Sequence, residues 1–519
     1  MNKTLIIALN FLFVSVAISQ STALKYEETI TESDLKKHLT YIASDELGGR
    51  DTGSEGQKKA GEYIVKHLEE YGLKPIVKAE DGSLSYYQRF NVYKNGWKES
   101  YVIINGKRKT FFKDFFPIGM VNIPAEKTIE TVFVGYGIKN DNRNDYKNKN
   151  IKGKAIIFIE DSPKDLTDHK IWEGNQGLKK KQTIAAELGA SFIFEISLKE
   201  ASQFKTLSAE RKAVLSRFNR MAIEKPKSET ESSLPSFVIS ESMAVEMLGI
   251  NSKKLGQYLN GKTNNISTKK TSIKIKSERG ADQIETANIM GFLEGTDKKD
   301  EVIIISAHYD HVGTDDKGQI YNGADDDGSG TCSILELAQA YSKAKAEGNG
   351  PRRSILFLWV TGEEKGLLGS KYYTDIDPII PLENTICDLN IDMIGRVDKK
   401  HEANPNYVYL IGSDKLSSEL HDISEKTNAK TINFELDYEF NDPKDPNRFY
   451  YRSDHYNFAK NKIPVIFYFT GVHEDYHKPG DDVEKIMFPK YAKIVKLVFE
   501  TSWNLANREN KILVDSNKP

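Results

Sequence analysis

Cysteine, excess charge of one sign and long apolar runs are all scarce in this chain of 519 residues. Only two cysteines, Cys332 and Cys387, are present, so a disulfide framework is excluded and at most one bridge can form. Lysine and arginine number 73 against 75 aspartates and glutamates, which leaves no basic excess to attract nucleic acid or anionic lipid. Apolar residues at 39% can nevertheless build a large core, so a disordered or low-complexity chain is excluded as well.

One largely apolar run, at residues 5–18, follows Lys3 near the N-terminus. The small residues Ala17 and Ser19 then stand where a signal peptidase reads, which predicts a signal peptide over residues 1–19. The run is about 14 residues long, short of the roughly 20 that span a bilayer. We therefore expect an exported protein, periplasmic or secreted, with no membrane anchor after cleavage. An uncleaved anchor is the alternative.

The residue pattern divides the rest of the chain into three parts. Residues 31–42 and 54–71 read as amphipathic helices joined by a polar, Gly-rich loop at 44–53. Between residues 81 and 280, short β-like runs alternate with charged loops, which indicates a β-rich module inserted into another domain. From residue 281 to 508, apolar strand-like runs alternate with helical patterns, which is typical of an α/β sandwich. The expected domains are thus 27–80 with 281–508, and the insert 81–280.

Acidic residues and histidines follow four of the expected strands, those at 302–307, 354–360, 385–391 and 464–469. In open α/β sheets, ligands bind beyond the carboxyl ends of the strands, so these side chains are expected to meet there. The segments concerned are His308-Tyr309-Asp310-His311, Gly362-Glu363-Glu364, Asp392 and Glu474-Asp475-Tyr476-His477.

The mixture of residue types at this edge predicts a metal site. Two histidines with three carboxylates suit Zn²⁺ better than the all-oxygen shells of Ca²⁺ or Mg²⁺. Carboxylates suffice for two ions, and such a pair needs a bridging carboxylate. Asp326, in the Gly-rich turn at 322–330, is the candidate for that bridge.

The adjacent glutamates suggest a division of roles. Glu364 would bind a metal, while Glu363 would stay free as general base for the attacking water. Asp310 lies two residues beyond His308, on the same side if the strand continues, where its carboxylate would accept the second imidazole N–H of His308.

These motifs resemble those of the secreted dizinc aminopeptidases, whose superfamily also holds glutamate carboxypeptidases and glutaminyl cyclases. The resemblance covers roughly residues 30–80 and 286–505. The matching motifs are His308-Tyr309-Asp310, Gly323-Ala324-Asp325-Asp326-Asp327-Gly328-Ser329-Gly330, Gly362-Glu363-Glu364-Lys365-Gly366, Asn390-Ile391-Asp392-Met393-Ile394-Gly395, Arg452-Ser453-Asp454-His455 and Tyr476-His477.

The resemblance implies a three-layer α/β/α zinc-peptidase domain with a mixed, mainly parallel sheet and two zinc ions per chain. It places one zinc on His308, Asp326 and Asp392, and the other on Asp326, Glu364 and His477. Glu363 would be the base, and Tyr476 would donate a hydrogen bond to the developing oxyanion. Arg452 would hold substrate or form a structural ion pair, and Asp454 and His455 would be structural.

The insert resembles a protease-associated domain at residues 133–138 and 151–155. The disulfide that the family places near the last ligand has no match, since neither cysteine lies near His477 in the sequence. Cys332 and Cys387 are expected to be buried thiols.

The expected function is that of a zinc-dependent aminopeptidase acting on peptides. A carboxypeptidase or dipeptidase is the second hypothesis, in which the insert would hold a C-terminal carboxylate through arginine or lysine. A glutaminyl cyclase and a catalytically inactive binding ectodomain are further alternatives, although such an ectodomain should have lost ligands or the base.

Overall fold

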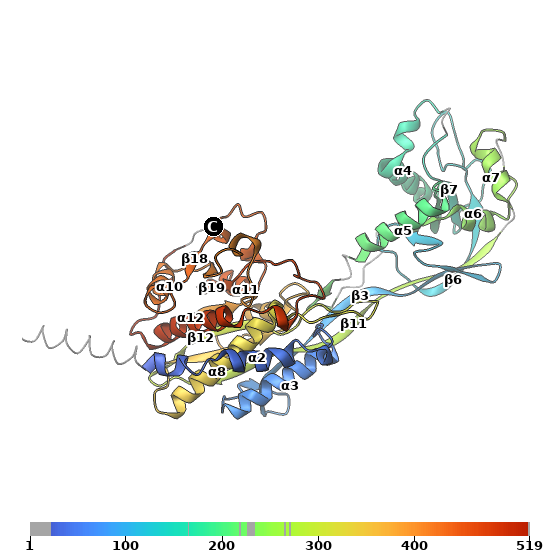
Figure 1. The fold of residues 1–519 in the computed structure, drawn as a ribbon. Coiled ribbons are helices and arrows are strands. Elements are labelled where there is room, and N and C mark those ends of the chain that lie inside the picture. Colours follow the sequence, from blue (N-terminus) through green and yellow to red (C-terminus); the bar gives the residue numbers. More distant parts are fainter. Residues whose placement is uncertain are drawn as a thin grey trace, which may run out of the picture. The chain divides into compact units, whose positions relative to one another are not determined.

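Figure 1 shows a computed structural model that describes residues 22–163, 166–216, 220–225, 234–263, 266–268 and 271–516. The expected signal peptide, residues 1–19, lies outside the described residues. Among the residues described, no helix has the length and apolar character needed to cross a membrane. The chain divides into two compact units, one of Met1–Asn91 with Ile284–Pro519 and the other of Val92–Gln283. The corresponding bounds expected from the sequence were 27–80 with 281–508, and 81–280.

A mixed, mainly parallel sheet forms the centre of the first unit. Its strands lie in the order β18-β17-β19-β16-β12-β15-β11. The four strands β19, β16, β12 and β15 run parallel, whereas β17 and β11 are antiparallel to their neighbours in this group. The bounds are β11 (Ser272–Leu293), β12 (Lys298–His308), β15 (Arg353–Val360), β16 (Thr385–Ile391), β17 (Tyr407–Ile411), β18 (Glu435–Asp437) and β19 (Val465–Phe469). Short strands outside it are β1 (Val77–Lys78), β2 (Leu84–Ser85), β13 (Gly313–Thr314) and β14 (Ile320–Tyr321).

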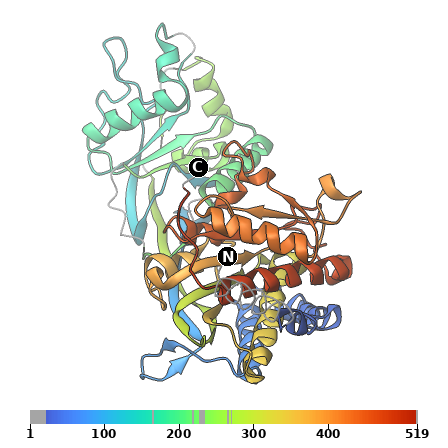
Figure 2. The same cartoon turned by 90° about the vertical axis from the view of Figure 1, so that its left-hand side faces the viewer.

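Helices cover both faces of this sheet, so the predicted three-layer α/β/α architecture is confirmed (Figures 1 and 2). Alternate residues of β12 show the two faces, since Ile303 and Ile305 join one apolar cluster and Val302 and Ile304 join another. The first face packs against α2 (Glu32–Ile42), α3 (Glu55–Glu70), α8 (Gly330–Ala346), α10 (Ser418–Lys430) and α12 (Phe488–Asn507). The second packs against α9 (Leu368–Asp375) and α11 (His455–Ala459).

The first two helices begin where the sequence predicted. The Thr31 side chain accepts a hydrogen bond from the backbone N–H of Asp34 at the start of α2, at 3.1 Å. Ser54 does the same for the N–H of Gln57 at the start of α3, at 3.2 Å. The Ser54 cap therefore fixes the end of the Gly-rich loop at 44–53 where the chain enters α3.

The second unit is more helical than the β-rich module expected from the sequence. Strands β6, β7, β8 and β10 run parallel, and β5 is antiparallel to β10. The chain enters and leaves this unit through the long strands β3 and β11. The bounds are β3 (Tyr87–Ile104), β4 (Lys107–Thr110), β5 (Phe115–Pro117), β6 (Ile123–Phe133), β7 (Ala155–Ile159), β8 (Phe192–Ile196), β9 (Met221–Ala222), β10 (Ser236–Ile239), α4 (Gly174–Glu187), α5 (Ala201–Ser216), α6 (Glu241–Leu248) and α7 (Ser252–Leu259).

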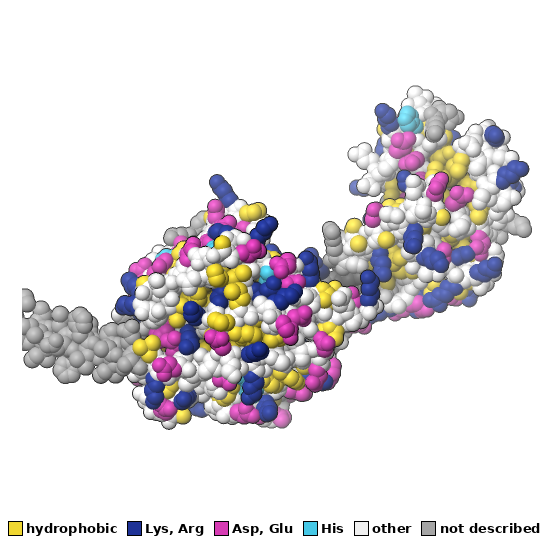
Figure 3. Space-filling model, viewed as in Figure 1, with side chains coloured by type: hydrophobic (Ala, Val, Ile, Leu, Met, Phe, Trp, Pro, Cys, Tyr) yellow, Lys and Arg dark blue, Asp and Glu magenta, His cyan; other side chains and the backbone are white. Residues whose placement is uncertain are grey.

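Charges of both signs are mixed over the face drawn in Figure 3. Several opposite charges form ion pairs, such as Arg352 with Asp297 at 2.7 Å and Lys74 with Glu294 at 2.7 Å. This distribution follows from the near balance of the two signs in the sequence.

Candidate metal centre

The site is built at the carboxyl edge of the parallel strands. His308 is the last residue of β12, and Asp392 follows the last residue of β16. Glu363 and Glu364 come three and four residues after the end of β15, while Tyr476 and His477 lie on the loop after β19. Because the four strands run parallel, their ends meet at one edge of the sheet, as the sequence predicted.

The five predicted ligand side chains lie together, with Asp326 in the middle. Its Oδ1 atom is 3.3 Å from Nε2 of His308, which in turn is 3.7 Å from Oδ1 of Asp392. Its Oδ2 atom is 3.1 Å from Nε2 of His477, which is also 3.1 Å from Oε2 of Glu364. The two oxygens of Asp326 thus face two separate groups of ligand atoms, as a bridging carboxylate must.

Several of these polar atoms are buried without a hydrogen-bond partner among the described residues. They are His308 Nε2, Asp326 Oδ2, Asp392 Oδ1 and Glu364 Oε1. Burying such atoms unpaired is costly, and one cation in each of the two groups would satisfy all four. Imidazole nitrogens with carboxylate oxygens form a ligand set typical of zinc. The residues at this edge therefore fit a pair of zinc ions.

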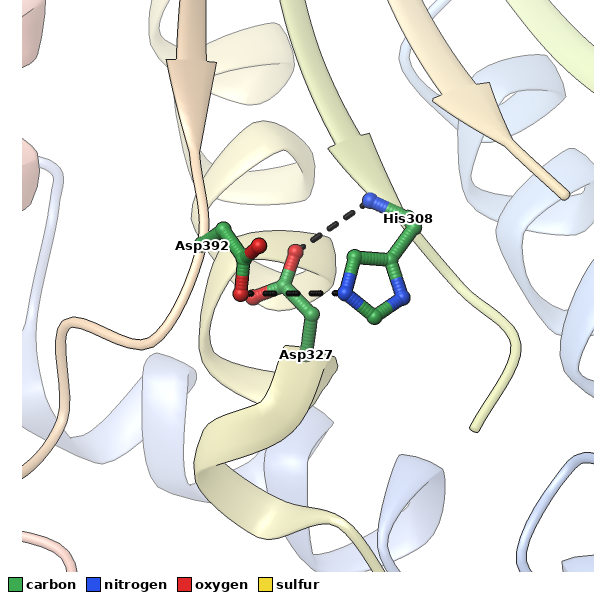
Figure 4. Close-up of side chains that lie close together, drawn as sticks. All are labelled: His308, Asp327 and Asp392. Carbon is green, nitrogen blue, oxygen red and sulfur yellow. Dashed lines mark hydrogen bonds and ion pairs between the residues drawn. The ribbon is translucent and has the colours of Figure 1, made fainter. Parts of the chain in front are cut away.

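Asp327, next to the expected bridging residue, holds the backbone of the site through hydrogen bonds. Figure 4 shows its carboxylate beside His308 and Asp392. Its Oδ2 atom accepts from the backbone N–H of His308 at 3.2 Å, and its Oδ1 atom accepts from the N–H groups of Gly330 at 2.8 Å and Met393 at 3.3 Å. Both oxygens are thus occupied by backbone donors, which tie three segments of the site together.

The backbone of the bridging turn is held by two residues that the sequence analysis passed over. Asp481 accepts hydrogen bonds from the N–H groups of Asp325 and Asp326, at 3.0 and 3.1 Å. The fully buried guanidinium of Arg50 donates to the carbonyl oxygens of Asn322 at 2.7 Å and Gly323 at 3.0 Å. The loop at 44–53 therefore fixes the turn that presents Asp326.

The predicted hydrogen bond from His308 to the carboxylate of Asp310 is wrong. Nδ1 of His308 lies 3.9 Å from that carboxylate but 3.0 Å from the backbone carbonyl oxygen of Asp310, which can only accept. Nδ1 therefore carries the proton and leaves Nε2 as the ligand atom. The carboxylate instead accepts from the Thr52 hydroxyl at 2.7 Å and from the backbone N–H of Glu363 at 3.2 Å, so it positions the expected base.

Asp392 and Glu363 have distinct surroundings. Ser453 donates to Oδ2 of Asp392 at 2.7 Å and itself accepts from the Asn390 amide at 3.0 Å, which orients the carboxylate. Burial raises the pKa of Glu363 well above its usual range, and the nearby Glu364 raises it further, although His308 opposes the shift.

A small cavity beside these carboxylates has an apolar wall. Glu363, Asp326, Asp392 and Ser453 line one side. Tyr476 and Arg452 also line it, and Arg452 donates to the Tyr476 hydroxyl oxygen at 3.1 Å. The apolar wall is formed by Met393, Phe449, Phe467, Phe469 and Val472.

Ionic contacts hold the loop that carries Tyr476 and His477. Asp475 accepts from Arg396 and from Lys485, both at 2.8 Å.

Cys332 and Cys387 are free, buried thiols, as predicted. Asp454 and His455 are buried as well, and Asp454 accepts a hydrogen bond from Ser370.

His311 is a further residue of the site, to which the sequence analysis assigned no role. It is fully buried, and its Nδ1 atom lies 2.9 Å from Oε1 of Glu364 and 3.8 Å from Oδ2 of Asp326. The only signal in the sequence is its place in the segment that follows β12.

Comparisons with known proteins find similarity to peptidases. Residues 288–502 match the model of Peptidase family M28. Leucine aminopeptidase 2 of Arthroderma otae is 29% identical over 224 residues, 39% of this chain and 41% of that protein. A probable leucine aminopeptidase of Arthroderma benhamiae is 31% identical over 221 residues, 40% of this chain and 55% of that protein. A solved zinc aminopeptidase from Bacillus subtilis is 18% identical, with a TM-score of 0.48 over 93% of this chain and 98% of its own.

The chain thus spans about half the length of the curated relatives that it matches. The matched region contains all five expected ligands, Glu363 and Tyr476. Residues 288–502 are thus similar to peptidase family M28.

Proposed function

We propose that the chain is an exported, zinc-dependent aminopeptidase that removes N-terminal residues from peptides. The observation that carries this proposal is the placement of Asp326 between two groups of ligand atoms, with Glu363 free beside them. His308, Asp326 and Asp392 would hold one zinc ion, and Asp326, Glu364 and His477 the other. When bound, the two ions would polarise the scissile carbonyl and make hydroxide available near neutral pH.

The side chains of the cavity have complementary tasks. Glu363 takes a proton from the attacking water and passes it to the leaving amine. Because Arg452 already donates to the oxygen of Tyr476, the proton of the Tyr476 hydroxyl is free to bond to the developing oxyanion. Acidic groups such as Glu363 would anchor the α-amine of the substrate. Such an amine anchor favours an aminopeptidase over a carboxypeptidase.

The apolar wall of the cavity supports a preference for apolar N-terminal side chains. Phe449, Phe467 and Phe469 offer aromatic surface directly beside the acidic groups. The curated relatives named above are called leucine aminopeptidases, in keeping with such a preference.

Export and the role of the insert belong to the same proposal. Residues 1–19 would be removed as a signal peptide, which leaves the enzyme in the periplasm or outside the cell. The unit Val92–Gln283 would be a protease-associated module.

The test compares Glu363→Gln with the wild type on leucine p-nitroanilide, an N-blocked peptide and a peptide with a free C-terminus. Wild-type chain should release the N-terminal residue only from unblocked substrates, lose activity to a chelator and regain it with zinc. Glu363→Gln should keep its zinc content while kcat falls by about 10²–10⁴-fold. Glu402→Gln, which changes an exposed glutamate, should retain full activity. Near-normal turnover by Glu363→Gln would remove that residue from the role of base.

A further inference from the structure

The backbone around His311 holds its imidazole firmly in the site. Its backbone N–H donates to the carbonyl oxygen of Arg50 at 3.1 Å, which ties it to the loop at 44–53. The ring lies against Gly323, where a Cβ atom would come within 2.5 Å of His311 Cδ2. Gly323 is therefore required for the ring to stand where it does.

The ring nitrogen that faces the site meets two carboxylates without forming a hydrogen bond. Nδ1 of His311 is 2.9 Å from Oε1 of Glu364, yet both atoms lack a hydrogen-bond partner among the described residues. The close distance without hydrogen-bond geometry is typical of two ligand atoms that point at a common ion. His311 lies on the same two carboxylates, Asp326 and Glu364, as His477 does.

The four distances are close to those between ligand atoms around a zinc ion, although Oε1 of Glu364 faces His311 while Oε2 faces His477. Zinc bonds of about 2.0–2.1 Å place neighbouring ligand atoms about 3.3 Å apart in a tetrahedron. Nδ1 of His311 lies 2.9 Å from Oε1 of Glu364 and 3.8 Å from Oδ2 of Asp326. Nε2 of His477 lies 3.1 Å from Oε2 of Glu364 and 3.1 Å from Oδ2 of Asp326. The two rings are inclined by 68° with centroids 5.8 Å apart, so they approach the carboxylates from different directions.

We propose that His311 is a fourth protein ligand of the second metal position, together with Asp326, Glu364 and His477. This inference deepens the proposed function and rests on its zinc pair.

Burial of an imidazole with unpaired nitrogens does not by itself indicate a metal ligand. His455 is equally buried and also lacks hydrogen-bond partners among the described residues, but its ring stacks on Phe467 at 4.7 Å. What distinguishes His311 is the pair of carboxylates in front of its Nδ1 atom.

A fourth protein ligand makes the two metal positions unequal. Structural zinc sites are closed by four protein ligands, whereas catalytic sites keep three and leave one position for water or substrate. The position at His308, Asp326 and Asp392 therefore stays open to water and substrate, while the ion at His311 would reach the substrate carbonyl only by expanding to five ligands. The closed position should fill first and release its ion last.

The experiment titrates the metal-free full chain with Zn²⁺ in competition with a chromophoric chelator. Wild type should bind two ions with clearly different affinities, and His311→Gln should weaken one of them by more than about 100-fold. Loss of a residue that only orients a ligand costs about 10–100-fold, so a smaller effect overturns the proposal. The matched control, His455→Gln, should leave both affinities unchanged.

A measurement on the unaltered protein keeps the proposal testable if His311→Gln does not fold. A crystal structure of the zinc-loaded chain should show an Nδ1–zinc distance of about 2.0–2.1 Å at His311, and a distance beyond 3 Å overturns the assignment. Failure of the proposed function is a separate result. A chain that binds zinc through His311 but cleaves no peptide would retain this inference and lose the aminopeptidase.

Discussion

The loop that presents Tyr476 and His477 depends on Asp475, and Asp475→Asn is the change that tests it. The carboxylate accepts from Arg396, whose side chain is 11% exposed, and from Lys485, which is 44% exposed. A charge-assisted hydrogen bond to the buried arginine is worth about 1.5–3 kcal/mol, and the exposed lysine adds at most about 1 kcal/mol. Asparagine keeps the shape but removes the charge, so the ordered loop should lose about 2 kcal/mol.

That loss corresponds to about a 30-fold lower population of the ordered loop. We expect kcat/KM for leucine p-nitroanilide to fall by up to this factor, and the affinity for the zinc ion at His477 to fall with it. Because Lys485 is exposed, high salt should weaken its pair with Asp475 and lower kcat/KM of the wild type part of the way towards that of the variant, while changing the variant little. Asp422→Asn, which breaks an exposed pair with Lys426, is the control and should change neither quantity. If Asp475→Asn kept the kcat/KM and the zinc affinity of the wild type, the reasoning would be refuted.

Two further predictions concern zinc affinity and pH. Ser453→Ala removes the hydrogen bond that orients Asp392, so competition titration should show zinc binding weakened by about 10–100-fold. An unchanged affinity would mean that packing alone orients the carboxylate. Burial and the adjacent Glu27 raise the pKa of Glu500, on α12, to about 8. An unfolded glutamate titrates near 4.3, so between about pH 4.5 and 8 the folded chain holds a proton that the unfolded chain releases. The free energy of unfolding should therefore fall as pH rises through this range, by at most about 1.4 kcal/mol per pH unit. Glu500→Gln should flatten the dependence of Tm on pH between 5 and 8.5, and parallel curves for the two proteins would contradict the assignment.

The site could be predicted from the sequence to the extent that the strands position it. His308 and Asp392 stand at the ends of apolar runs, and parallel runs of this kind share one carboxyl edge. The role of Asp310 was misjudged because β12 ends at His308, so the alternation of side chains no longer applies two residues later.

Residues that act from irregular segments could not be found in this way. Asp481 serves by accepting backbone N–H groups, which every residue except proline offers, so no pattern of side chains marks its partners. Arg50 donates a hydrogen bond to the carbonyl oxygen of Gly323, 273 positions further along the chain. Since every residue has a backbone carbonyl, the sequence does not mark this partner either. Helices α6 and α7 of the insert were not predicted, because each has only eight residues, too few for a helical period to stand out.

The contacts of Arg50 also bear on how the protein is made. The loop at 44–53 leaves the ribosome together with α2 and α3, but their partners on α8 and the turn at Gly323 follow some 270 residues later. At about 5–20 residues per second, this interval lasts roughly 15–50 seconds. During that time the apolar faces of the two helices have nothing to pack against, while Val92–Gln283 can already close its own core. Newly made chains should therefore bind chaperones through α2 and α3 until synthesis passes β12 and α8.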